Sequence, residues 1–135
     1  MFGKSLTLVS AMLTSSAVFA DIDLPAKMEG RWKLMSGTTG GSVIEVVQVE
    51  GPDKVQVKVT MSDVPSSHGA QYGRCDFGTV SAVAERSAGA WSIPAPSIRC
   101  PSFTINIRPV EGKQQFEGTL SASPGGPGSI TYEWK

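Results

Sequence analysis

The chain has 135 residues, with 12 Lys plus Arg balanced by 12 Asp plus Glu, so its formal net charge is zero. A near-neutral surface lacks the basic field that nucleic acids and anionic membrane surfaces require, which argues against both as partners. The length suits a single domain with one hydrophobic core.

Residues 1–20 have the three parts of a secretory signal peptide. Lys4 provides the charged n-region, an apolar stretch begins near Leu6, and Val18-Phe19-Ala20 predicts a cleavage site. The apolar run is too short, and too often interrupted by Ser and Thr, for a transmembrane helix. We therefore expect residues 21–135 to form a single mature domain, periplasmic or secreted, with no membrane span.

After the signal peptide, apolar and polar residues alternate with a period of two, which indicates β-strands. We expect a first strand at residues 31–36 and a second at residues 43–49. The turn Gly51-Pro52-Asp53 joins the second strand to a third at residues 54–61. The second strand is predicted to have Val43, Glu45, Val47 and Val49 on one face and Ile44, Val46 and Gln48 on the other.

Weaker alternation predicts two strands at about residues 73–83 and 90–94, separated by the sequence ERSAG. The two cysteines, Cys75 and Cys100, would then lie at the starts of the fourth and sixth strands. An oxidising compartment favours their pairing in a structural disulfide. The pair does not have the Cys-x-x-Cys spacing that is usual for redox-active centres.

Three further strands are expected near the C-terminus, at residues 103–108, 116–121 and 130–135, with turns at residues 111–113 and at SPGGPGS. Eight strands in order with short connections predict an all-β fold, an eight-stranded antiparallel up-and-down barrel. A two-sheet β-sandwich is the alternative. In the barrel, both cysteines would lie at one end, where a bridge is geometrically reasonable.

The first expected strand carries Gly30-Arg31-Trp32. A Gly-x-Trp at this place in an eight-stranded meander resembles the calycin superfamily, which includes lipocalins, avidins and small bacterial metalloprotease inhibitors. The resemblance implies that Gly30 lets the chain enter the barrel closely. It also implies that Trp32 packs across a closed end, often beneath a basic side chain from the last strand. A buried Trp at the start of a different β-domain is the alternative.

The longest irregular segment, SDVPSSHGAQYG at residues 62–73, contains three candidate binding residues. His68, Gln71 and Tyr72 offer hydrogen-bond donors, acceptors and a stacking face, and a loop of this length in a compact domain is often functional. The alternative is a polar connection shaped by Pro65 and Gly69.

Trp91 is a candidate for lining a ligand cavity, because apolar pockets in barrels are lined by aromatic side chains. Plain core is the alternative for this residue. An eight-stranded barrel is just wide enough either to be filled by side chains or to hold one small ligand. The sequence leaves both outcomes open.

The stretch Asp21-Ile22-Asp23-Leu24-Pro25 resembles the lead-in of bacterial metalloprotease inhibitors, in which a Leu-Pro shortly precedes the Gly-x-Trp. The resemblance implies an extended N-terminal arm that enters a protease cleft, with Asp21 and Asp23 as candidate contacts. A frayed terminus, or a short plug over the end of the barrel, is the alternative.

The sequence lacks the parts of the common catalytic and metal sites. His68 is the only histidine, no Gly-x-Ser-x-Gly elbow is present, and GTTGGS has no lysine for a phosphate loop and predicts a turn. We therefore expect no catalysis, no metal and no cofactor. The predicted function is an exported binding protein that recognises a protein partner, inhibitor-like or immunity-like, through a loop end or the N-terminal arm. A lipocalin-like carrier of a small apolar ligand is the alternative.

Overall fold

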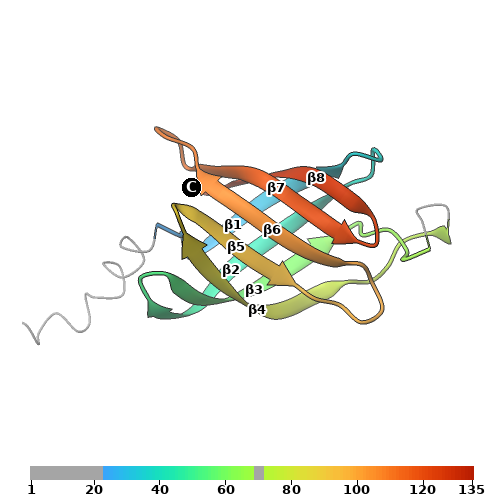
Figure 1. Cartoon of the computed structure of the whole chain (residues 1–135), viewed down its shortest axis with the longest axis horizontal. Helices are drawn as coiled ribbons and strands as arrows, with labels where there is room; N and C mark the ends of the chain where they lie inside the picture. The colour runs from blue at the N-terminus through green and yellow to red at the C-terminus, as the bar shows by residue number, and fades with distance from the viewer. Residues whose placement is uncertain (1–22, 69–71) are drawn as a thin grey trace, which may run out of the picture.

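The computed structural model describes residues 23–68 and 72–135, which form eight antiparallel strands in one closed barrel (Figure 1). The strands are β1 (Lys27–Leu34), β2 (Thr39–Gly51), β3 (Lys54–Ser62), β4 (Gly78–Ser87), β5 (Ala90–Ala95), β6 (Ser102–Pro109), β7 (Gln115–Ser123) and β8 (Gly126–Glu133). Each strand pairs with the next, and β8 returns to pair with β1. The predicted up-and-down barrel is confirmed, and the sandwich is excluded.

The connections divide into two groups, one at each end of the barrel (Figure 1). The end at the right of Figure 1, here called the loop end, carries residues 35–38, 63–68, 72–77, 96–101 and 124–125. The opposite end, here called the hairpin end, carries the turns at residues 52–53, 88–89 and 110–114. Residues 23–26 and 134–135 also lie at the hairpin end.

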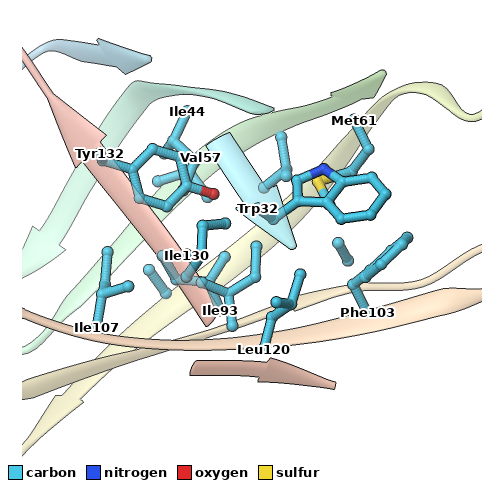
Figure 2. Close-up of a cluster of buried hydrophobic side chains, with 14 of the residues drawn as sticks. Trp32, Ile44, Val57, Met61, Ile93, Phe103, Ile107, Leu120, Ile130 and Tyr132 are labelled. Atoms are coloured by element: carbon cyan, nitrogen blue, oxygen red, sulfur yellow. The ribbon is translucent and has the colours of Figure 1, made fainter. Parts of the chain in front are cut away.

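Inward-facing side chains fill the barrel. On β3 the predicted alternation is confirmed, because Val55, Val57, Val59 and Met61 are all at most 2% exposed. Figure 2 shows aromatic and aliphatic side chains from different strands pointing toward one another in the interior. The largest fully buried side chains include Trp32, Trp91, Tyr132, Phe103 and Phe116.

Two glycines make room for the aromatic side chains around β1. Gly30 pairs with Ser42 on one side and with Tyr132 on the other. Because Gly30 has no side chain, the Tyr132 ring lies against its Cα, and the Tyr132 hydroxyl reaches the Ser42 hydroxyl at 2.8 Å. Burial raises the pKa of Tyr132 well above its ordinary value, and the hydrogen bond with Ser42 partly offsets this rise.

Trp32 lies over a second glycine. Its register partner is Gly40, and a Cβ at that position would overlap the indole ring and the Ser62 carbonyl. The indole Nε1 donates to the Gly41 carbonyl at 2.9 Å, and the ring packs on Phe103 with the centroids 5.6 Å apart. The side chain of Trp32 is 2% exposed, so it closes the core toward the loop end.

Two boundaries near these glycines differ from the sequence predictions. β1 begins at Lys27 rather than at residue 31. The segment GTTGGS, predicted as a turn, contributes its last four residues to β2, and residues 35–38 make the turn. The physical reason is the close approach of Trp32, since glycine inside a strand often marks a site where a neighbouring group must come close.

A β-bulge corrects the predicted faces of the second strand. Register shifts occur between Val46 and Gln48, and again between Val49 and Gly51. Val47 is therefore 55% exposed, whereas Val49 packs against the core. The prediction that both residues share one face was wrong, because the extra residue of a bulge reverses the alternation beyond it.

The fourth strand begins later and ends later than predicted. Residues 73–77 belong to the preceding loop, and β4 runs from Gly78 to Ser87. The separating turn is only Ala88-Gly89 rather than ERSAG, and both residues have positive φ, 53° and 80°. Two successive positive φ values are typical of the tight turn that joins a two-residue hairpin.

The substitution Gly40→Ala tests the role of the glycine beneath Trp32. We expect it to lower the free energy of unfolding by roughly 1–3 kcal/mol, because the added methyl group must displace the indole or the strand. Gly51→Ala is the matched control, since a Cβ there meets nothing within 4 Å. Urea denaturation measures both, and equal stability of the two variants would contradict the packing role.

The pH dependence of stability tests the burial of Tyr132. Because its pKa is raised in the folded protein, the unfolded chain releases this proton first, and the free energy of unfolding should fall as the pH rises above about 10. Tyr132→Phe should remove this part of the decline. Denaturation of both proteins between about pH 8 and pH 11 measures the difference, and parallel curves would contradict the prediction.

Candidate functional site

Three exposed apolar side chains lie at the loop end. Met35, Tyr72 and Ile98 come from three different loops there and are 82%, 67% and 102% exposed. Val47 and Val83, on the outer wall of the barrel, are the other exposed large apolar residues in the described part of the chain. Exposed large apolar side chains can mark an interaction surface. We therefore take the loop end as the candidate site.

In the loop at residues 63–77, the described residues next to the barrel are held by backbone hydrogen bonds. The Cys75 amide donates to the Val64 carbonyl at 2.7 Å, and the Ser66 amide donates to the Gly73 carbonyl at 3.0 Å. Pro65 and Arg74 form an isolated β-bridge between these two hydrogen bonds. Val64 is fully buried and anchors the base of the loop, and residues 64–66 and 73–75 form a small two-stranded stem.

The predicted disulfide joins this loop to its neighbour. Cys75 and Cys100 are bonded, with their Cα atoms 5.7 Å apart. The Ser67 hydroxyl also donates to the Arg99 carbonyl at 3.1 Å. The loops at residues 63–77 and 96–101 therefore form one connected structure.

Two of the three candidate residues in the long loop lie together at its tip. His68 and Tyr72 are both exposed, with ring centroids 6.3 Å apart in an edge-on arrangement. Gln71 lies outside the described residues. Below the tip, Arg74 and Asp63 form an ion pair at 2.7 Å. Because both of its side chains are largely exposed, this pair contributes little to stability.

The N-terminal segment lies at the opposite end of the barrel. Asp21 is outside the described residues, and Asp23 is exposed. Leu24 is 1% exposed, and the Val46 amide donates to the Ala26 carbonyl at 2.9 Å. The side chain of Leu24 therefore belongs to the core. This position agrees with the alternative in which the N-terminal segment forms a short plug over the end of the barrel.

Trp91 is part of the core near the hairpin end. It is fully buried, and its Nε1 has no hydrogen-bond partner among the described residues. The Arg86 guanidinium lies 5.1 Å from the centre of the ring, and it also forms an ion pair with Asp53 at 3.0 Å. A basic side chain thus stacks on a buried Trp. The Trp is Trp91 rather than Trp32, and the basic residue lies on β4 rather than on the last strand.

Two of the grooves on the described surface bear on this site. One, of about 570 Å³, runs between the start of β4 and the loop at residues 96–101, beside the disulfide. Its lining residues are Asp76, Val80, Pro96, Ser97, Ile98, Arg99 and Cys100. The other, of about 610 Å³, crosses the outer wall over Gly41, and its rim includes Glu29, Glu133, Asp63 and Arg31. Only the first groove has an exposed apolar residue from the loop end on its rim.

Sequence reasoning missed Met35 and Ile98. The identity of an apolar residue in a turn does not show whether its side chain folds inward. The exposure of Met35 and Ile98 is therefore known only from the folded barrel. The prolines on either side of Ile98 at residues 94, 96 and 101 were the available signal, because they exclude the segment from regular strand pairing.

The described residues hold no group of three or more His, Cys, Asp or Glu side chains placed to bind a metal ion. Within residues 23–68 and 72–135, no helix has the length and apolar character needed to cross a membrane. Comparisons with known protein families and with curated protein sequences found no match.

Removal of the disulfide tests its contribution to the site. The double variant Cys75→Ser, Cys100→Ser should lower the free energy of unfolding by about 3 kcal/mol, because the unfolded chain regains the entropy of the open loop. Exchange of the backbone amides at positions 66 and 75 should rise more than exchange in β6 and β7. Unchanged stability together with unchanged exchange would show that the barrel alone orders the loops.

Proposed function

We propose that this protein is an exported, non-catalytic binding protein that recognises a protein partner through its loop end. The observation that carries the proposal is the position of Met35, Tyr72 and Ile98, which are exposed on three separate loops at one end of a barrel. Leaving these side chains in water has a free-energy cost that burial against a partner removes. Two of the three loops are joined by the disulfide, so the surface needs little ordering on binding.

The packed interior supports a partner outside the barrel. Trp32, Trp91 and Tyr132 occupy the lumen, where a lipocalin-like carrier would need space for its ligand. The buried Leu24 side chain, at the hairpin end, also supports the loop end over the N-terminal arm as the binding surface. A disulfide-bonded small barrel fits an oxidising compartment, in agreement with export.

Photo-crosslinking tests the proposal in the native compartment. A photoreactive amino acid replaces Met35, Tyr72 or Ile98 in separate variants, and Glu117, exposed on the outer wall of β7, is the matched control. We expect the same protein to be crosslinked from at least two of the three loop-end positions and not from position 117. Crosslinks at all four positions, or at none, would contradict a binding surface at the loop end.

Native mass spectrometry of the purified protein separates this function from the alternative. A bare protein mass, reduced by the two hydrogens lost on disulfide formation, is expected for a barrel filled by its own side chains. A mass excess that matches a bound small molecule would instead favour the carrier, and the loop end would then lose its assigned role.

A further inference from the structure

Among the sulfur atoms of the described residues, only one is both reduced and open to solvent. Met28 and Met61 are 1% and 2% exposed. Cys75 and Cys100 are bonded to each other, and the described part of the chain holds no free cysteine. Met35, in contrast, is 82% exposed. An oxidant in solution therefore has direct access to one reduced sulfur on the described surface, the thioether of Met35.

Met35 has a fixed backbone position at the loop end. It follows Leu34, the last residue of β1, whose side chain is 2% exposed. The Met35 amide donates to the Pro127 carbonyl at 2.9 Å, and the Leu34 amide donates to the Thr38 carbonyl at 2.8 Å. Because side chains alternate along a strand, the residue after Leu34 directs its side chain away from the core. The thioether is thus presented to solvent from a turn that backbone hydrogen bonds hold in place.

The rest of the turn leaves the thioether uncovered. Ser36, Gly37 and Thr38 have small side chains, and a Cβ at Gly37 would meet nothing within 4 Å. The hydroxyl oxygens of Ser36 and Thr38 lie 3.4 Å apart, so these two side chains interact with each other. A small oxidant can therefore approach the sulfur of Met35 from open solvent.

Hydrogen peroxide converts an accessible thioether into a sulfoxide. A lone pair of the sulfur attacks one peroxide oxygen, so an S–O bond forms and the O–O bond breaks. The departing hydroxide takes the proton left on the transferred oxygen and leaves as water. The sulfur is oxidised, the peroxide is reduced, and no further reagent is needed. Methionine sulfoxide reductases reverse the change, so the modification can act as a switch.

We propose that Met35 is an oxidation-sensitive site at which peroxide weakens binding of the partner protein and reduction of the sulfoxide restores it. This inference rests on the proposed function and adds its regulation. Met35 shares the loop end with Tyr72 and Ile98, and burial of its apolar side chain against a partner is favourable. A sulfoxide oxygen in the same place must lose its water, which is unfavourable unless the partner supplies a hydrogen-bond donor.

The barrel is protected from the oxidant that modifies Met35. Met28 on β1 and Met61 on β3 are buried in the core, so their sulfurs meet solvent only when the structure opens locally. Oxidation of a core methionine disrupts packing, whereas the Met35 side chain lies outside the core. Peroxide can therefore change the binding surface while the fold is retained.

The rate of oxidation at each methionine tests the modification site on the full, disulfide-bonded protein. The folded protein is treated with hydrogen peroxide, the reagent is removed with catalase, and peptide mapping detects the mass increase of about 16 Da per sulfoxide. We expect Met35 to react at least about tenfold faster than Met28 or Met61. In urea-unfolded protein the three rates should become similar. Equal rates in the folded protein would overturn the inference.

Photo-crosslinking from position 98 tests the effect on binding. Protein with a photoreactive amino acid in place of Ile98 is mixed with an extract of its native compartment, before and after treatment with peroxide. We expect the yield of the crosslinked partner to fall at least about fivefold after oxidation, as for a weakened affinity. Treatment with methionine sulfoxide reductases for both epimers should restore it. An unchanged yield with Met35 converted to the sulfoxide would overturn the switch.

Two leucine variants assign the effect to one sulfur. Met35→Leu cannot form a sulfoxide, so its crosslinking yield, compared with its own untreated sample, should not respond to peroxide. Met28→Leu is the matched control, because it removes a buried thioether and keeps Met35, and its yield should fall as in the unsubstituted protein. Leucine and methionine have similar volumes, so both variants should fold, which circular dichroism verifies. A fall in Met35→Leu equal to that in Met28→Leu would overturn the inference.

The outcomes separate this inference from the proposed function. Crosslinks that persist undiminished after oxidation would overturn the switch and leave the loop end as the binding surface. The absence of crosslinks from position 98 before any oxidation would contradict the proposed function and remove the switch with it. The oxidation rates of Met35, Met28 and Met61 are measured without a partner, so they decide the modification site in either case.

Discussion

The narrow lumen of an eight-stranded barrel is the constraint on which this structure depends. Trp32 and Tyr132 fit inside only because Gly40 and Gly30, on paired strands, leave their inner positions empty. These aromatic side chains occupy the central space that a carrier would keep for its ligand. The same packing therefore stabilises the barrel and directs any binding activity to its outer surface and ends.

The fold was more predictable than the site, for a physical reason. Val55, Val57 and Val59 alternate with polar residues, and alternation alone determines which side of a strand is buried. Val49 does not follow this rule because a bulge reverses the alternation before it. The bulge arises from pairing with β3, and the local sequence pattern does not reveal that pairing. The disulfide was predictable because its two cysteines fall at one end of a meander.

The residues of the candidate site could be predicted from the sequence only in part. His68 and Tyr72 were identified through the length of their loop, whereas the exposure of Ile98 was signalled only indirectly, by the prolines around it. Pro94 and Pro96 did carry a readable signal, since prolines at alternate positions mark a strand that cannot donate on one side. Which neighbour loses its pairing depends on register, and register follows from the fold. The early end of the ladder between β4 and β5 thus required both levels of information.

The positions of Asp23 and Lys135, the first and last described residues, have a practical consequence for attaching this protein to a surface. Asp23 precedes the Leu24 plug at the hairpin end, and Lys135 follows β8 at the same end (Figure 1). A linker attached beyond either position would leave the barrel from the side opposite Tyr72 and Ile98. Immobilised on a solid support through either end, the molecule would stand with its disulfide-bonded loops facing the solution, more than the length of a β-strand away from the surface.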